Sequence, residues 1–162
     1  MLPILFCAAL IALDQLSKYL AYTLLRPVQT VPIINGVFSL TYVENVGAAF
    51  GIFEGARWFF LIITVVIVAG IVFYYRKLPK NKAYNKARFA LILISSGALG
   101  NFIDRLRNGY VVDFLHARFI DFPVFNLADS YVVIGVIFFA ILYLFVYKEN
   151  KTVKSRVEQG SL

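Results

Sequence analysis

Four long apolar stretches dominate this 162-residue chain and restrict the folds open to it. A helix that crosses the hydrocarbon core of a bilayer needs about 20 predominantly apolar residues. Four segments come close to that length, and they cover residues 2–24, 58–75, 89–106 and 127–147. Hydrophobic residues make up 60% of the chain and charged residues 15%, against about 25% charged residues in a typical soluble domain. We therefore predict an integral membrane protein with four transmembrane helices.

The first apolar stretch is predicted to be a retained helix rather than a cleaved secretory signal. A signal peptide has a basic start, an unbroken apolar centre and a small-residue cleavage site. No basic residue precedes this stretch, and Asp14 and Lys18 interrupt it. We expect residues 1–147 to form a single membrane domain that is followed by a basic tail, residues 148–162.

The net charge of +7 is explained by two basic segments. Residues 76–88 and 148–162 hold ten of the 16 basic residues and two of the nine acidic ones, so they carry +8 while the rest of the chain carries −1. Basic residues next to spanning helices mark the cytoplasmic side. We therefore expect both termini of this multi-pass membrane protein to be cytoplasmic, and we expect no nucleic-acid partner.

The outer segment over residues 25–57 is predicted to contain a β-hairpin. Residues 31–34 and 37–43 are rich in β-branched and aromatic side chains, and they flank Asn35-Gly36, which favours a two-residue type I′ turn. Apolar and hydroxyl side chains alternate along the second run, as in a half-buried strand. The alternative is an irregular loop. The predicted fold is all-α within the membrane, with a small outer β-hairpin.

Scarce polar residues gather at one predicted depth. An ionisable side chain at membrane depth costs about 2.5–3.5 kcal/mol on insertion scales, so each one needs a partner or a function. In the predicted topology six ionisable residues and two asparagines meet near the outer leaflet boundary. They are Asp14, Lys18, Asn101, Asp104, Arg105, Asp113, Asn126 and Asp129.

Most of these residues also have a purely structural interpretation. Asp14 and Lys18 are spaced i, i+4 and can pair on one helix face. Asp104 with the following arginine can anchor the end of the third helix at the lipid head groups. Asn126 and Asp129 can cap the fourth helix. Asp113, which lies among valines and a phenylalanine, fits no capping or surface pattern.

Asp113 and Asp129 together suggest paired-carboxylate chemistry. Two carboxyls about one water apart share a proton near neutral pH, so one acts as a base and the other as an acid. The base can deprotonate a water that attacks a peptide carbonyl, while the acid protonates the carbonyl oxygen. The 16-residue separation does not itself bring them together, so their meeting is a hypothesis about the fold.

The sequence contains few residues that could support other reactive chemistries. His116 is the only histidine and Cys7 the only cysteine, which excludes multi-histidine zinc sites and cysteine clusters. No G-x-S-x-G elbow or Walker-type phosphate loop is present. We expect neither a metal nor another cofactor.

Five motifs, in order along the chain, resemble those of the lipoprotein signal peptidase (signal peptidase II) family of bacteria. They are Asp14-Gln15-Leu16-Ser17-Lys18, Asn45-Val46-Gly47-Ala48-Ala49-Phe50, the run of residues 97–105, Val111-Val112-Asp113-Phe114 and Phe125-Asn126-Leu127-Ala128-Asp129-Ser130. The one departure that we notice is Ser95-Ser96, where a further glycine is expected.

The resemblance implies a membrane aspartyl endopeptidase whose catalytic pair is Asp113 and Asp129 and which uses no metal. The implied substrate is a prolipoprotein that carries a diacylglyceryl group on its lipobox cysteine and is cut N-terminal to that cysteine at the outer leaflet. The implied site and support residues are Asp14, Lys18, Asn45, Gly47, Asn101, Asp104, Arg105, Asn126 and Ala128. Residues 25–57 resemble the β-cradle of the family and part of 107–125 its outer flap. We expect a monomer among membrane lipids.

A small proton- or ion-coupled transporter or channel subunit is the alternative, since intramembrane carboxylates also serve proton paths. A conduit needs ionisable groups spread across the membrane, whereas here they gather at one end. A scaffold without chemistry would leave Asp113 unexplained.

Overall fold

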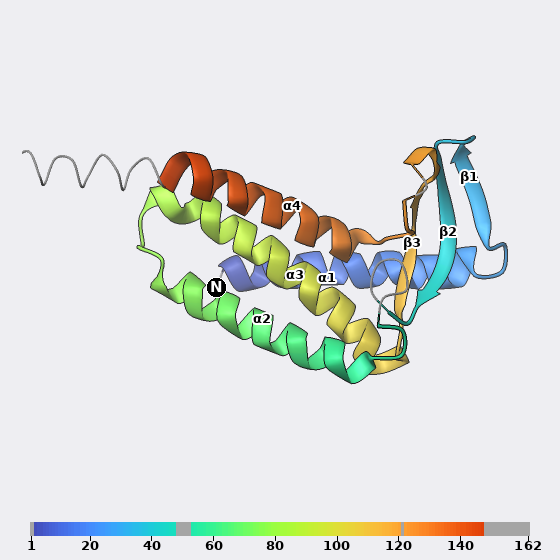
Figure 1. Cartoon of the computed structure of the whole chain (residues 1–162), viewed down its shortest axis with the longest axis horizontal. Helices are drawn as coiled ribbons and strands as arrows, with labels where there is room; N and C mark the ends of the chain where they lie inside the picture. Colours follow the sequence, from blue (N-terminus) through green and yellow to red (C-terminus); the bar gives the residue numbers. More distant parts are fainter. Residues whose placement is uncertain (1, 48–52, 121, 148–162) are drawn as a thin grey trace, which may run out of the picture.

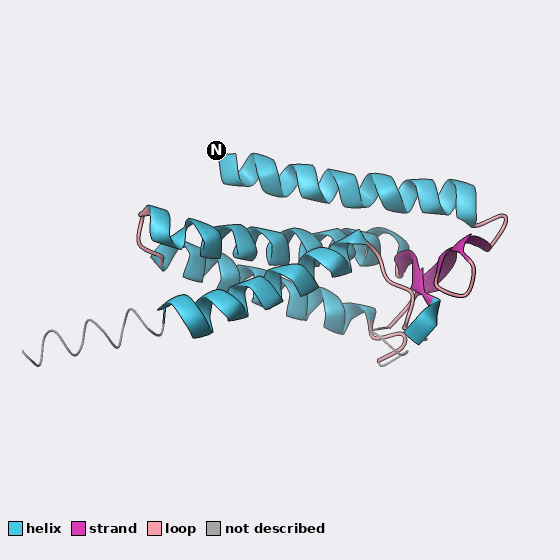
Figure 2. Ribbon diagram, turned by 90° about the horizontal axis from the view of Figure 1, so that it is seen from above, coloured by secondary structure: helices cyan, strands magenta, loops and turns pink. Residues whose placement is uncertain are grey.

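The computed structural model describes residues 2–47, 53–120 and 122–147 (Figure 1). Part of the second motif, Ala48-Ala49-Phe50, and the basic tail lie outside the described residues. Four long helices run side by side, and a small β-sheet lies at one end of them (Figures 1 and 2). The helices are α1 (Leu2–Leu20), α2 (Arg57–Lys77), α3 (Asn85–Asn108) and α4 (Leu127–Ile141), with π-helical segments Ala21–Leu25 after α1 and Leu142–Tyr147 after α4.

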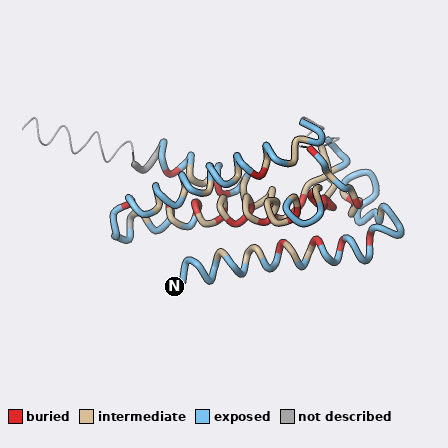
Figure 3. Tube along the Cα trace, turned by 90° about the horizontal axis from the view of Figure 1, so that it is seen from below, coloured by how far each residue is buried: buried red, intermediate tan, exposed pale blue. Residues whose placement is uncertain are grey.

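All four helices are long and apolar enough to span a membrane, as predicted. The spans cover Leu2–Leu25, Arg57–Lys77, Asn85–Asn108 and Leu127–Leu144. Their apolar side chains face outward to an unusual degree, because the surrounding lipid takes the place of a protein core. In α2 the one buried residue is Leu61, and in α1 the only buried residues are the charged Asp14 and Lys18. Figure 3 shows the buried positions concentrated along α3 and toward the sheet.

The predicted hairpin is present, but its turn differs from the prediction. Strands β1 (Thr30–Ile34) and β2 (Phe38–Asn45) pair antiparallel, and Ile34 pairs with Phe38 across a three-residue connection. A type I′ turn needs a positive φ at both central residues. Gly36 has a φ of 72°, while Asn35 has no positive φ, so the prediction of a type I′ turn was wrong.

A third strand, β3 (Val111–Ala117), was not predicted. It pairs antiparallel with β2 and gives the sheet order β1-β2-β3. The register sets Val43 opposite Asp113 and Asn45 opposite Val111. The simple alternation expected for β2 also fails at Ser39, which is fully buried and accepts a hydrogen bond from the Arg118 Nε at 3.0 Å.

Helix α3 packs against each of the other three helices and most extensively against α4. Glycines make this close packing possible. A Cβ built on Gly97 would collide with the carbonyl oxygen of Ala128, and it would lie 2.7 Å from the Val132 Cγ2. At Gly135 of α4, a Cβ would lie 2.7 Å from the Ile94 Cγ1 of α3. Small residues therefore serve packing inside the bundle.

We expect Gly97→Ala to lower the free energy of unfolding by about 1–3 kcal/mol, because the added methyl group overpacks the interface between α3 and α4. Gly70→Ala in α2 is the matched control, since a Cβ there meets nothing within 4 Å. The measurement is thermal unfolding of both variants in the same detergent. Equal effects of the two substitutions would show that close approach at Gly97 is not required.

Candidate active site

Five elements bring the predicted site residues to the sheet end of the bundle (Figure 1). They are the second half of α1, the last turns of α3, strands β2 and β3, and the first turn of α4. Each contributes polar side chains that are wholly or partly buried. These side chains contact one another and form three groups, which are an ion cluster, a layer of asparagine amides (the amide layer) and two carboxylates.

The ion cluster is centred on the Lys18 ammonium, which is 3% exposed. Its Nζ lies 2.9 Å from the Asp14 Oδ2 and 3.1 Å from the Asp104 Oδ2, and it donates to the Asn101 Oδ1 at 2.8 Å. Three acceptors thus match the three protons of the ammonium. The i, i+4 pair of Asp14 and Lys18 is confirmed. The interpretation of Asp104 as an anchor at the lipid head groups is not supported, because this carboxylate is buried within the cluster.

Both carboxylates of the cluster also hold other elements in place. The backbone N–H of Ala128 donates to the Asp14 Oδ1 at 3.0 Å, which fixes the start of α4 against α1. A negative charge is favourable at this helix N-terminus. The backbone N–H of Val112 donates to the Asp104 Oδ2 at 3.2 Å, which ties β3 to α3.

The first turn of α4 is closed by a reciprocal capping box between Asn126 and Asp129. The Asn126 side chain accepts the Asp129 N–H at 3.0 Å, and the Asp129 Oδ2 accepts the Asn126 N–H at 3.1 Å. The predicted cap is therefore present. It uses one carboxylate oxygen of Asp129, so the other oxygen is free for a second contact.

An amide layer connects the ion cluster to the two candidate catalytic carboxylates. The Asn101 Nδ2 donates to the Asp129 Oδ1 at 2.7 Å, and the Asn126 Nδ2 donates to the Asp113 Oδ1 at 2.6 Å. The Asn45 Nδ2 donates to the Asp113 Oδ2 at 2.8 Å. All four oxygens of the two aspartates therefore accept one N–H each.

The orientation of each asparagine amide is determined by a hydrogen-bond donor that contacts its side-chain oxygen. The Asn101 oxygen faces the Lys18 ammonium, which can only donate, so the Asn101 NH₂ group must face Asp129. The Asn126 and Asn45 oxygens accept backbone N–H groups of Asp129 and of Gly47 in the same way. The charge of Lys18 thus determines which group of Asn101 is presented to the carboxylate.

Asp113 and Asp129 line one cavity of 590 Å³. Asp113 is 2% exposed and Asp129 is half-buried. Burial, and after it the charge of Asp129, raise the pKa of Asp113, while hydrogen bonds from Asn45 and Asn126 lower it, and together they give a pKa of about 7. The two carboxyls therefore lie within electrostatic reach, and one of them holds a proton near neutral pH.

The remaining wall of the cavity is mostly apolar. Its other lining residues are Asn45, Asn101, Arg105, Val111, Phe122, Pro123, Val124, Phe125, Ser130, Val133 and Ile134. Arg105 is held at the wall because its Nη2 donates to the Gly47 carbonyl at 2.8 Å and its Cζ lies 4.4 Å from the Phe60 ring centroid. The site can thus place a cation and a carboxylate pair beside an apolar ligand.

Every predicted site residue lies in this assembly. Asn45, Asn101, Arg105, Asp113 and Asp129 line the cavity. Gly47, Lys18 and Asn126 contact these lining residues, and Asp14, Asp104 and Ala128 are joined to them through Lys18 and Asp14. His116 instead lies in β3 opposite Ser39, and it is not among the lining residues. Within the described part of the chain, no group of three or more histidine, cysteine or acidic residues is arranged to hold a metal ion.

Sequence reasoning gave no site role to Gln15 or to residues 122–125, although Gln15 lies in the first motif and residues 122–125 lie in the segment that resembles the flap. The Gln15 Nε2 donates to the Asp104 Oδ1 at 2.9 Å and lies 3.2 Å from the Asp14 Oδ2, so it completes the ion cluster. Its position three residues before Lys18, on the same helix face, is the signal that could have identified it. Residues 122–125 carry only apolar side chains, so nothing in their own pattern indicates that they line the cavity.

Comparisons with known proteins agree on one family. A family model described as signal peptidase (SPase) II matches residues 6–145. A lipoprotein signal peptidase of Caldanaerobacter subterraneus subsp. tengcongensis is 46% identical over 145 residues, which cover 89% of this chain and 97% of that protein. One of Streptococcus pyogenes serotype M5 is 44% identical over 141 residues, which cover 87% of this chain and 90% of that protein.

Two solved structures share the fold. Both are described as bacterial membrane enzymes solved by the in meso method, at 2.3 and 1.9 Å resolution. The first has a TM-score of 0.81 and 38% identity and covers 92% of this chain and 90% of its own. The second has a TM-score of 0.77 and 38% identity, with coverages of 89% and 93%.

We expect Lys18→Met to lower the free energy of unfolding by about 3–5 kcal/mol, because it leaves two buried carboxylates without a cation. Asp14→Asn should cost less, about 1–3 kcal/mol, since Lys18 retains Asp104 and the amide oxygen can still accept the Ala128 N–H. Unfolding in detergent measures both, with the exposed Lys86→Met as control. A larger loss for Asp14→Asn than for Lys18→Met would contradict a cluster centred on the ammonium.

Proposed function

The chain belongs to the signal peptidase II family, and on this premise we propose that Asp113 and Asp129 are the catalytic pair of an aspartic endopeptidase. The chain is a multi-pass membrane protease that removes signal peptides from prolipoproteins. One observation carries the aspartic mechanism. Two carboxyls line the same cavity, and each of their four oxygens accepts an N–H from a fixed donor.

In the proposed reaction the ionised carboxylate of the pair takes a proton from water, and the resulting hydroxide attacks the scissile carbonyl carbon. The protonated carboxyl donates its proton to the carbonyl oxygen, which gives a neutral tetrahedral intermediate. A proton then passes from the pair to the amide nitrogen, and the C–N bond breaks while a hydroxyl proton of the intermediate returns to the pair, which restores its single proton. The products are a free carboxyl group on the signal peptide and a free amine on the mature lipoprotein.

The proton that the mechanism needs is shared between the carboxyl groups of Asp113 and Asp129. Because the pKa of Asp113 is raised to about 7, the pair with one proton is well populated near neutral pH. Asp129, which is more exposed, lies closer to incoming water and suits the role of the base. Asp113, which is the more deeply buried, suits the role of the acid.

The proposed substrate carries a diacylglyceryl group on the cysteine that follows the scissile bond. The apolar wall of the cavity suits acyl chains, and it continues onto the outside of α4. Val133 and Ile134 both line the cavity and are 55% and 56% exposed on a helix surface that lipid covers. A lipidated substrate could therefore enter sideways from the bilayer.

The other predicted site residues are proposed to position this pair. Asn45, Asn101 and Asn126 donate to the carboxylates, while Lys18, Asp14 and Asp104 orient Asn101 and hold α4 and β3 in place. Ala128 allows the close contact with α3 at the start of α4, and Gly47 accepts the hydrogen bond that holds Arg105. We propose that the site faces the outer leaflet, because the basic segment of residues 76–88 lies at the opposite ends of the helices.

The transporter alternative is not supported. The family and the named relatives are peptidases. The described acidic residues of the spans, Asp14, Asp104 and Asp129, also lie toward the sheet end, and α2 carries no charged residue between Arg57 and Arg76. No charged path therefore crosses the bilayer along this helix.

We expect Asp113→Asn and Asp129→Asn each to lower the cleavage rate of a diacylated prolipoprotein by about 10²–10⁴-fold or more, because either change removes acid–base catalysis by the pair. The assay is a gel shift with purified protein and lipidated substrate. Glu54→Gln is the matched control, since it neutralises an exposed outer acid. Near-normal turnover in either aspartate variant would remove that residue from the pair, and cleavage abolished by a chelator would contradict a metal-free mechanism.

We expect kcat/KM to fall as pH rises above about 7, because the pair then loses the proton that the acid must donate. Asn45→Ala should move this alkaline limb to higher pH. The Asn45 N–H stabilises the ionised form of Asp113, so its removal raises the pKa of that carboxyl. The pH–rate profiles of wild type, Asn45→Ala and Glu54→Gln test this, and a limb that moves to lower pH in Asn45→Ala would contradict it.

A further inference from the structure

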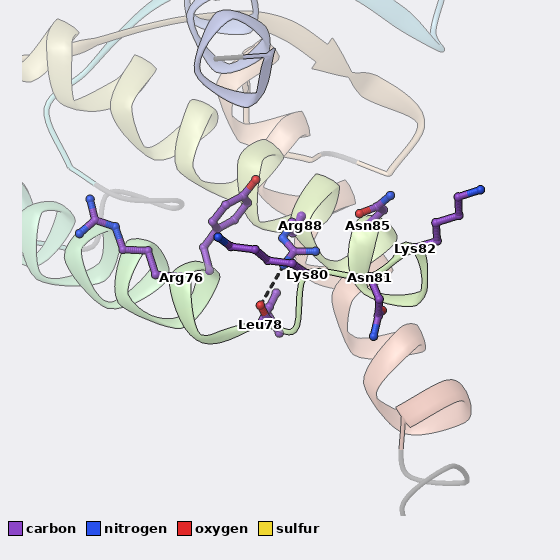
Figure 4. A pocket seen from close by; sticks show the side chains of 8 residues that line it. Arg76, Leu78, Lys80, Asn81, Lys82, Asn85 and Arg88 are labelled. Carbon is purple, nitrogen blue, oxygen red and sulfur yellow. Dashed lines mark hydrogen bonds between the residues drawn. The ribbon is translucent and has the colours of Figure 1, made fainter.

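A second, cationic cavity lies at the end of the bundle opposite the candidate active site. It has a volume of 760 Å³ and is bounded by the end of α2, the start of α3 and the connection between them (Figure 4). Its lining residues are Tyr75, Arg76, Leu78, Lys80, Asn81, Lys82, Asn85 and Arg88. Four cations and two side-chain amides thus surround one space, and among the described residues no acidic side chain lines it.

The position of this cavity along the bilayer normal is set by the two helices. Because α2 ends at Lys77 and α3 begins at Asn85 and both span the membrane, the connection lies at the lipid–water interface. That is the depth of phospholipid phosphates.

The cavity is shaped before any ligand arrives. Leu78 is buried in a small apolar cluster with Ala87 and Leu91, which fixes the path of the connection. The Arg88 Nη2 donates to the carbonyl oxygens of Leu78 and Pro79 at 2.9 and 2.8 Å. The Arg88 guanidinium also lies over the Tyr75 ring, with its Cζ 5.6 Å from the centroid. The side-chain entropy of Arg88 is therefore already restricted.

The charges of the cavity are available to a ligand. Within the described part of the chain, none of the four cations takes part in an ion pair, and neither the Nε nor the Nη1 of Arg88 has a hydrogen-bond partner. Figure 4 shows Lys80 beside Arg88, with Arg76 and Lys82 on the two flanks. A singly charged phosphodiester fits between such donors, since guanidinium and ammonium groups both bind phosphate oxygens.

The surroundings favour a lipid over a soluble anion. Phe73 of α2 lies three residues, about one helical turn, before the lining residue Arg76 and is 62% exposed. Acyl chains can cover this ring while the phosphate occupies the cavity. We propose that this cavity is a binding site for the phosphodiester of an anionic phospholipid, which docks the connection between α2 and α3 at the membrane surface. The proposal does not depend on the chemistry at Asp113 and Asp129.

The test uses native mass spectrometry of the purified full chain in neutral detergent, with phosphatidylglycerol as the probe. Lys80→Gln should weaken binding about fivefold, which is the effect of one basic residue near an anionic lipid surface. Arg88→Gln should weaken it at least as much. Because Arg88 also anchors the connection, Lys80→Gln, which removes no hydrogen bond among the described residues, is the decisive variant. Lys86→Gln is the matched control, since Lys86 belongs to the same basic segment but does not line the cavity.

Binding that stays within twofold of wild type in Lys86→Gln but falls in Lys80→Gln supports the site. Equal losses in both variants would overturn it, because the cations would then act only as a diffuse positive surface. Phosphatidylcholine that binds as tightly as phosphatidylglycerol would overturn the requirement for an anion. Displacement of the lipid by millimolar inorganic phosphate would assign the cavity to a soluble anion instead.

Discussion

The buried Lys18 ammonium is the contact on which the rest of the structure depends. A charge at this depth is tolerated only with partners, and its three acceptors come from α1 and α3. Two of them, Asp14 and Asp104, extend the interaction to the start of α4 and to β3 through backbone N–H groups. The third, Asn101, extends it to Asp129. One ammonium therefore connects three helices and a strand.

This arrangement reverses the usual distribution of residues in a soluble protein. In α1 the buried side chains are charged and the apolar ones face outward, because hydrocarbon rather than water surrounds the helix. Apolar contact provides little preference for one helix partner over another in lipid, since the tails are as apolar as leucine. Polar contacts at the sheet end and close glycine contacts along α3 and α4 therefore determine how the helices pack.

The sequence predicted those features that depend on spacing within one element. The i, i+4 contact between Asp14 and Lys18 and the cap by Asn126 follow from helix geometry alone. The third strand was missed because residues 111–114 are buried on both faces of the sheet, so Val111–Ala117 shows no regular alternation of apolar and polar side chains. The prediction of a two-residue type I′ turn at Asn35-Gly36 was wrong because three residues connect the strands. The bridging role of Asn126 could not be predicted, since its amide reaches Asp113 only after β3 has paired with β2.

Asp113 shows why an unexplained residue is informative in a membrane protein. Every other carboxylate of the site has a structural contact: Asp14 and Asp104 neutralise Lys18, and Asp129 caps α4. Asp113 accepts hydrogen bonds only from two side-chain amides, and it contacts no cation within hydrogen-bond distance among the described residues. Burial without a counter-ion is costly for a carboxylate, and protonation relieves that cost. In the proposed mechanism this proton, held beside a second carboxylate, is the one that acid–base cleavage of the peptide bond requires.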